Sequence, residues 1–321
     1  MARHQPELFS ISRMHLKKII CATDFSDLSN HAIAYGVSLA REFKARLYLC
    51  HVIDLSAATI YGEATFGFEP QVIRMEEYAN ERLKRIMAEH QIEWEPLVTT
   101  GSAADEVTRL AEEKGMDMAI AATRGRSGLK RFILGSVTEH LMRTLPCPLL
   151  TVHGPKKGTA VSIDQKIEFK RILVGVDFSP DSNLAFQYGL NMAQEFQSEL
   201  HLVHVIEPPV YKDIPKSVEG AREIIRKSLY KQLNDKLEGM VPAEALNWCK
   251  PKTTLLAGYP HEELSKYADL QNIDLLVLGV RGHSLMESLF VGSTTERVIR
   301  KAPCAVLSVR PMTRVTSSGD Q

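Results

Sequence analysis

The sequence predicts an α/β protein made of two copies of one doubly wound domain, each with a five-stranded parallel sheet. The first observation is an internal repeat, because Asp24-Phe25-Ser26 returns as Asp177-Phe178-Ser179, an offset of 177 − 24 = 153 residues. Between residues 24 and 53, 16 of 30 positions are identical to the residue 153 further on, whereas unrelated stretches would share roughly 2. The second is that each copy alternates apolar runs with amphipathic stretches. The third is the length of 321 residues, which suits two domains of about 150.

The first copy starts with a strand and a helix. Residues 18–23 form a short apolar run, as in a buried parallel strand. Ser26 or Asp27 can cap the helix that follows, in which Ala32, Gly36 and Leu39 lie near helical spacing. The same alternation continues, and we expect strands at 46–53, 94–100, 116–122 and 148–152, with helices at 71–89, 103–114 and from 136 onward.

The second copy repeats this order, and its strands are expected near 170–176, 199–206, 250–256, 273–279 and 304–309. Such alternation with short right-handed crossovers implies a parallel sheet covered on both faces. We divide the chain into a first domain (1–153), a linker (154–168), a second domain (169–310) and a polar tail (311–321). Ligands of doubly wound sheets bind beyond the carboxyl ends of the strands, where the strand order reverses. We therefore expect the ligand-binding residues in the loops after the first and fourth strands.

Composition limits the partners and the compartment. Lys+Arg and Asp+Glu both number 39, so no global basic field exists to collect nucleic acid. The five cysteines contain no CxxC pair, which favours reduced thiols over a disulfide framework. Residues 1–15 lack the apolar run of a signal peptide, and no segment approaches transmembrane length. We expect a cytoplasmic protein that binds neither nucleic acid nor membrane.

The loop after the fourth strand of the second copy indicates anion binding. Its spacing is Gly-x2-Gly-x9-Gly-Ser, formed by Gly279, Gly282, Gly292 and Ser293. Glycines let backbone amides approach an anion closely, and Gly292-Ser293 opens a helix whose free amides and dipole favour phosphate. The alternative is a glycine turn followed by an ordinary serine N-cap.

An aspartate ends the first strand of each copy, Asp24 in copy one and Asp177 in copy two. A carboxylate at this edge can accept a hydrogen bond from a ribose hydroxyl or an adenine-side donor. It can also cap the next helix. The two roles are not exclusive, and the spacing does not choose between them.

This ordered set of motifs resembles the universal stress protein family in a tandem arrangement. The resemblance rests on the strand-end Asp followed by Phe-Ser, the His-Val in the second strand, the glycine loop, and the Pro-Cys before the last strand. It implies a Rossmann-like sheet of strand order 3-2-1-4-5 and a site for ATP, with adenine near the first two strands and phosphates in the glycine loop. In copy two the implied site residues are Asp177, Val205, Gly279, Gly282, Gly292, Ser293 and Thr294. In copy one they are Asp24, Val52, Gly125, Gly135, Ser136 and Val137.

The two copies differ in the glycine loop. Copy one has Ala122 where copy two has Gly279, and a methyl group there disfavours positive φ and crowds a phosphate. Copy one has more cations nearby, including Arg124, whereas copy two offers Arg281. We include both arginines in their sites. A phosphate needs converging backbone amides before nearby cations can strengthen its binding. We therefore favour copy two as the nucleotide site.

Histidine and cysteine give weaker signals. His201 and His204 are three apart on a strand, so they point to opposite faces and cannot share a metal ion. We expect packing or edge hydrogen bonds for His51 and His204, and no metal site. Cys147 and Cys304 each follow a proline at a strand start, where we expect buried cysteines acting as small hydrophobes.

The predicted function is nucleotide binding without fast catalysis. The chain has no Gly-x4-Gly-Lys-Ser/Thr, no Gly-x-Ser-x-Gly and no His-Glu-x-x-His, and no general base is recognisable. We expect an ATP-binding stress regulator whose ATP carries Mg²⁺. The alternatives are a nucleotide-independent interaction scaffold and a slow ATPase. Single-copy relatives commonly pair through their last strands, so we expect the two copies to pair within one chain, with a homodimer as a further option.

Overall fold

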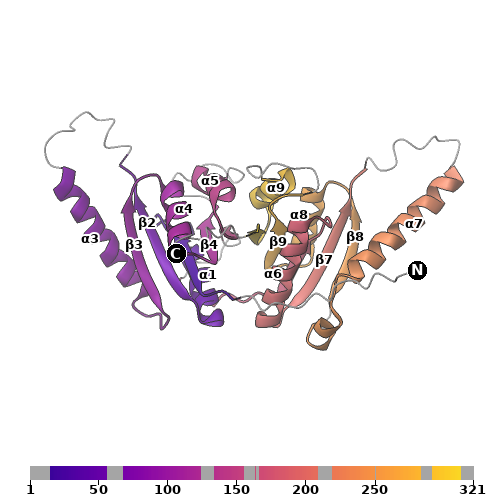
Figure 1. Cartoon of the computed structure of the whole chain (residues 1–321), viewed down its shortest axis with the longest axis horizontal. Helices are drawn as coiled ribbons and strands as arrows, with labels where there is room; N and C mark the ends of the chain where they lie inside the picture. The colour runs from indigo at the N-terminus through magenta and orange to yellow at the C-terminus, as the bar shows by residue number, and fades with distance from the viewer. Residues whose placement is uncertain are drawn as a thin grey trace, which may run out of the picture.

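The computed structural model describes residues 15–55, 68–123, 134–154, 163, 166–208, 219–249, 251–282 and 291–311. These residues form one ten-stranded sheet with the order β3-β2-β1-β4-β5-β10-β9-β6-β7-β8. Each half is a parallel five-stranded sheet of order 3-2-1-4-5. The predicted fold class is confirmed, and Figure 1 shows the halves side by side with the long helices α3 and α7 at the two outer ends.

The elements of copy one lie close to their expected positions. They are β1 (Lys18–Ala22), α1 (Asp27–Phe43), β2 (Arg46–Ile53), α3 (Phe68–Met87), β3 (Trp94–Thr100), α4 (Ala103–Glu113), β4 (Met118–Ala122), α5 (Ser136–Thr144) and β5 (Leu149–Val152). Of the two candidate caps, Ser26 is the N-cap of α1, and its side chain accepts from the Ser29 amide. The charged helix α3 begins at residue 68 instead of 71, and β4 begins two residues later than expected.

Copy two repeats the series. Its elements are β6 (Arg171–Gly175), α6 (Pro180–Phe196), β7 (Glu199–Ile206), α7 (Glu219–Glu238), the short 3₁₀ helix η3 (Ala243–Asn247), β8 (Lys252–Ala257), α8 (Pro260–Leu270), β9 (Leu275–Gly279), α9 (Ser293–Lys301) and β10 (Ala305–Val309). None of the helices in the described ranges has both the length and the apolar run needed to cross a bilayer.

Two hydrophobic cores lie on opposite faces of the sheet. One core contains buried side chains of α1, α3, α6 and α7, including Ile33, together with Phe169 just before β6. The other contains side chains of α4, α5, α8 and α9, including Leu141 and Ile299. Strand residues alternate between the cores, as the period of a strand requires: Ile19 lies in the first and Ile20 in the second. Both cores therefore run through both copies.

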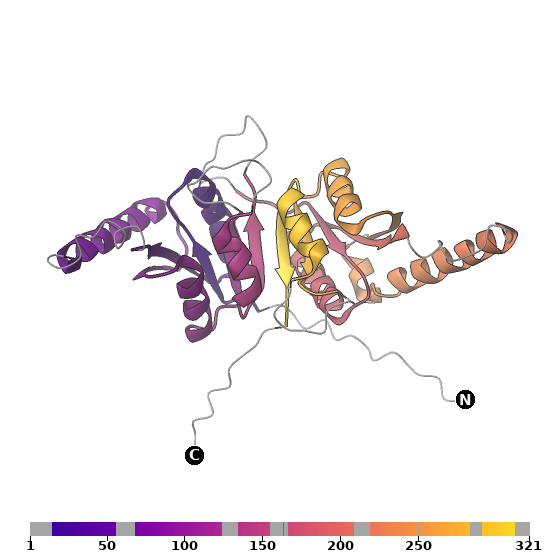
Figure 2. The same cartoon turned by 90° about the horizontal axis from the view of Figure 1, so that it is seen from above.

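The two copies join through their last strands. β5 and β10 pair antiparallel, with Leu150 opposite Leu307. The Thr151 hydroxyl donates to the Val306 carbonyl at 3.0 Å, and the Ser308 hydroxyl donates to the Leu149 carbonyl at 3.1 Å. The expected pairing within one chain is thus present, and Figure 2 shows both strands at the centre of the molecule.

The two Pro-Cys cysteines differ in burial. Cys147 is buried, as expected, but Cys304 is only partly buried. All five cysteines are free thiols. The expectation of a buried Cys304 is wrong because it lines a cavity between the copies, which is described below.

His31 gives a pH-dependent contribution to stability. Its ring is buried in α1, and its Nδ1 has no hydrogen-bond partner among the described residues. Burial lowers the pKa of His31 from its ordinary value of 6.5. The unfolded chain therefore binds a proton that the folded chain disfavours, so the free energy of unfolding falls as pH drops through about 6.5.

We predict that His31→Leu flattens this decline between pH 7 and pH 5, because copy two has Leu184 at the same repeat position. Urea unfolding at several pH values measures the slope. A variant with the wild-type slope would contradict the assignment to His31.

Candidate functional site

The strand-end aspartates hold the turns that lead into α1 and α6. Asp24 Oδ1 accepts the Ser26 amide at 3.0 Å, and Asp177 Oδ1 accepts the Ser179 amide at 2.9 Å. These are Asx turns, in which a side-chain oxygen replaces a backbone acceptor. The helix-entry role of these aspartates is therefore present in both copies, and it leaves each carboxylate at the carboxyl edge of the sheet.

The phenylalanine after each aspartate explains the repeated motif. Phe25 has φ +63° and Phe178 has φ +64°, a left-handed conformation that costs a bulky residue on the order of 1–3 kcal/mol. The rings pack against His51 and His204, with centroid distances of 4.2 and 4.8 Å. The strained Phe and the distant His of the second strand are thus parts of one structural unit.

The histidines of this unit bind backbone. His51 Nδ1 donates to the Thr23 carbonyl at 2.8 Å, and His204 Nδ1 donates to the Val176 carbonyl at 2.7 Å. His201 Nδ1 instead lies 2.9 Å from the Tyr267 hydroxyl, on another part of the sheet. The backbone hydrogen bonds of His51 and His204 are those expected from the sequence. Within the described ranges, no group of three His, Cys, Asp or Glu side chains converges.

A cavity of about 290 Å³ lies at the switch point of copy one, between the ends of β1, β2 and β4 and the helices α4 and α5. It brings together five of the predicted residues, namely Asp24, Val52, Gly135, Ser136 and Val137. The other two, Arg124 and Gly125, lie outside the described residues. The remaining lining residues are Ala22, Thr23, Ser29, Cys50, Ala103, Val107, Ala121, Ala122 and Thr138.

The helix that opens onto this cavity leaves amides available. Gly135 is the N-cap of α5 and supplies no side-chain cap, so the first-turn amides have no intrahelical acceptor. Gly135 N–H donates to the Thr123 carbonyl at 2.9 Å, and the Thr138 hydroxyl donates to the Ala122 carbonyl at 2.8 Å. These two bonds fix the start of α5 against the end of β4 and aim the free amides at the cavity.

Copy two repeats this helix entry. Gly292 is the N-cap of α9 without a side-chain cap. Gly292 N–H donates to the Val280 carbonyl at 2.7 Å, and the Thr295 hydroxyl donates to the Gly279 carbonyl at 2.7 Å. Ser293 is exposed, Thr294 is half-buried, and Val205 is buried in β7. The repeated Thr138 and Thr295 are a signal that sequence comparison of the two copies could have found.

The role expected for Gly279 is wrong in one respect. Its φ is not in the left-handed region, so positive φ does not require glycine there. An added Cβ would instead lie 2.7 Å from the Asp181 backbone carbon and 2.9 Å from the Asp181 carbonyl oxygen. Gly279 is therefore needed for the close approach of α6 to the end of β9.

The second glycine of the loop makes a different contact. A Cβ on Gly282 would lie 2.8 Å from Asp177 Oδ2, and one on Gly292 would lie 3.2 Å from the Val280 carbonyl oxygen. The loop backbone of copy two thus runs directly beside the strand-end carboxylate.

Arg281 is engaged by a partner that the sequence did not indicate. Asp181, in the first turn of α6, is buried, and its Oδ2 lies 3.0 Å from Arg281 Nε and accepts the Arg281 amide at 3.2 Å. Arg281 Nη2 donates to Asp181 Oδ1 at 3.3 Å. Copy one has Leu28 at this repeat position. The carboxylate therefore holds Arg281 on the α6 side of the sheet, away from the face formed by α8 and α9.

Comparison with known proteins agrees with this architecture. The family described as "Universal stress protein family" matches residues 15–153 and 168–310. A universal stress protein of Synechocystis is 22% identical over 316 residues, covering 92% of this chain and 100% of that protein. One from Methanocaldococcus jannaschii is 32% identical over 143 residues, covering 44% of this chain and 84% of that protein.

A solved structure shows the same fold over most of the chain. The crystal structure of a universal stress protein from Archaeoglobus fulgidus has a TM-score of 0.66 at 19% identity, covering 93% of this chain and 100% of that chain. Another universal stress protein was crystallised in complex with cAMP, and it matches 44% of this chain and 98% of that chain at 23% identity with a TM-score of 0.33.

We predict that Gly279→Ala destabilises copy two, by about 1–3 kcal/mol of unfolding free energy, because its methyl group overlaps the Asp181 backbone. Gly292→Ala is the matched control, with a smaller expected loss because its nearest atom is 3.2 Å away. Denaturant unfolding of both variants tests the difference, and equal losses would show that the close approach is not the reason for glycine at position 279.

Proposed function

The chain belongs to the universal stress protein family, and we propose that it binds ATP at the carboxyl edge of its sheet and acts through the bound state without fast turnover. The observation that carries this proposal is the copy-one cavity. It lies at the switch point of the sheet, where doubly wound folds bind ligands, and it is lined by five residues expected for a nucleotide site.

The residues that line the copy-one cavity match the base, the ribose and the phosphates of a nucleotide in chemical character. Val52, Ala103 and Val107 supply an apolar wall for a base. Asp24 follows the end of β1 and lines the cavity, and a carboxylate oxygen there can accept a hydrogen bond from a ribose hydroxyl. The uncapped amides at Ser136 and Val137 face the same space and favour a phosphate through the helix dipole.

The volume of the cavity fits only part of a nucleotide. At about 290 Å³, the cavity is near the lower end of ligand pockets, about 300 Å³. This is room for the base and sugar, with the phosphates lying over the start of α5. Mg²⁺ would accompany the phosphates, since adjacent phosphate oxygens attract a divalent ion.

Copy two is the second candidate site. It has the same helix entry and the complete glycine spacing, on which the preference for copy two rests. Two contacts now favour copy one as the first site: Asp181 holds Arg281, and the Gly282 backbone runs beside Asp177. We therefore propose copy one as the primary nucleotide site and copy two as the second. The preference for copy two that the sequence indicated is untested, and variants of Asp24 and Asp177 distinguish the two sites.

A binding protein without a recognisable general base fits a cytoplasmic regulator in the stress response, and the five free thiols agree with a reducing compartment. The scaffold alternative draws support from the β5–β10 pairing, which joins the copies without any ligand. The two readings differ in whether the purified protein releases a near-stoichiometric nucleotide when it is denatured.

We predict that Asp24→Asn weakens ATP binding about tenfold, the cost of one hydrogen bond to a charged group. Asparagine keeps the Asx turn to Ser26, because its Oδ1 is still an acceptor, but replaces the second oxygen with a donor. Isothermal titration of the full chain with ATP and Mg²⁺ measures the affinity. Asp177→Asn is the matched variant for copy two.

The pair of variants assigns the sites. A loss confined to Asp24→Asn supports copy one, and a loss confined to Asp177→Asn supports copy two. Unchanged affinity in the double variant would refute both assignments, and absence of ATP binding to the wild-type chain would favour the scaffold. Release of ADP above the spontaneous rate would favour the slow ATPase.

A further inference from the structure

The residue that follows the last strand of each copy reaches into the other copy. Arg310 follows β10, and its guanidinium donates to the carbonyls of Met142, Arg143 and Leu145 at the end of α5, with distances of 3.0 Å from Nη1 to Arg143 O and to Leu145 O. His153 follows β5, and its Nε2 donates to the Ile299 carbonyl near the end of α9 at 2.6 Å. Since 153 + 157 = 310 and 142 + 157 = 299, the two contacts are counterparts in the repeat.

Each of these residues is also tied to the glycine loop of its own copy. Val280 N–H donates to Val309, the residue before Arg310, at 2.8 Å. Thr123 N–H donates to Val152, the residue before His153, at 2.9 Å. The start of each glycine loop is therefore one residue away from the contact with the other copy.

The helices contacted in this way begin at the two proposed nucleotide sites. α5 runs from Ser136, which lines the copy-one cavity, to Thr144, beside the carbonyls that Arg310 binds. Nine residues of helix are a rod of about 13 Å. Fixing its carboxyl end fixes the direction in which its free amino-terminal amides point.

We propose that Arg310 of copy two is a positioning residue for the copy-one nucleotide cavity, and that His153 has the weaker corresponding role for copy two. The inference deepens the proposed function and rests on it. Each pocket is then set in part by a residue of the other copy, so the tandem arrangement is a requirement of the sites as well as of the fold.

The charges agree with this role. A cation at a helix carboxyl end interacts favourably with the dipole, and a guanidinium can satisfy several orphan carbonyls together. Burial lowers the pKa of Arg310 from its ordinary value, with Arg281 acting in the same direction and Asp181 against it. Arginine nevertheless stays protonated in proteins, so this contact persists across the working pH range.

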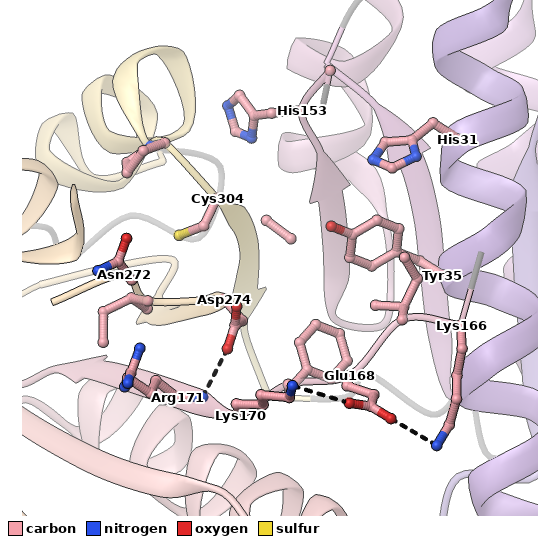
Figure 3. A pocket seen from close by; sticks show the side chains of 16 residues that line it. His31, Tyr35, His153, Lys166, Glu168, Lys170, Arg171, Asn272, Asp274 and Cys304 are labelled. Atoms are coloured by element: carbon pink, nitrogen blue, oxygen red, sulfur yellow. Dashed lines mark hydrogen bonds and ion pairs between the residues drawn. The ribbon is translucent and has the colours of Figure 1, made fainter. Parts of the chain in front are cut away.

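The His153 side of the junction is more open. A cavity of about 550 Å³ lies there, between α1 and the turns before β9 and β10. Figure 3 shows His31 and Tyr35 on one side of it and Cys304 and Asp274 on the other, with His153 also among the lining residues. Imidazole is shorter than the Arg310 side chain and has fewer donors, so α9 is held less firmly than α5.

The first test is Arg310→Ala in the full chain. We expect amide hydrogen exchange in α5, at residues 139–144, to become about fivefold faster, while exchange in α9 stays unchanged. In an Asp177→Asn background, ATP affinity at copy one should fall about fivefold. Arg310→Lys keeps a cation at the helix end and should restore part of both effects. Arg297→Ala, an exposed arginine of α9, is the control and should change neither.

The second test gives the His153 position the guanidinium that its repeat counterpart Arg310 has. His153→Arg places a guanidinium beside the open cavity, and we expect slower exchange in α9 and, in an Asp24→Asn background, tighter ATP binding at copy two. Unchanged α5 exchange in Arg310→Ala would overturn the anchoring role, whether or not ATP binds. Faster α5 exchange with unchanged copy-one affinity would overturn the positioning role. If the wild-type chain binds no ATP, the proposed function fails, and the exchange experiment still decides the anchoring role.

Discussion

The antiparallel pairing of β5 with β10 is the interaction on which the rest of the molecule depends. Each copy alone would end its sheet at one of these strands, and an unpaired edge invites association with another chain. Here each strand covers the edge of the other, with Thr151 and Ser308 hydroxyls adding bonds across the junction. Two parallel sheets thereby become one ten-stranded sheet with continuous cores on both faces.

Joining the copies in this way places the last helix of each copy against the other copy. α5 and α9 lie on either side of the junction, and Arg310 and His153 cross it to reach their carboxyl ends. The amino-terminal ends of the same helices stand at the switch points of the sheets. A duplicated domain thus gains contacts that one copy alone lacks, because the carboxyl end of each last helix accepts a hydrogen bond from a residue of the other copy.

The repeat separates residues that build the domain from residues that distinguish its pockets. The Asp-Phe-Ser motif and the His of the second strand recur because a left-handed Phe must pack against an imidazole that binds the strand-end carbonyl. Ala122 against Gly279 and Leu28 against Asp181 differ between the copies. These two differences are coupled, because Gly279 admits the backbone of Asp181, which in turn engages Arg281.

The sequence by itself determined the duplication, the strand order through its family resemblance, and the positions of most strands, because these depend on local periodicity and on motifs that occur twice. It also predicted that five residues of copy one lie together at the carboxyl edge of the sheet, where they line one cavity. Only the tertiary structure decided why Gly279 is glycine, which partner holds Arg281, and how Arg310 reaches α5. Those contacts join residues at least 279 − 181 = 98 positions apart, and no pattern along the chain encodes the approach of two backbones or the direction of a buried side chain.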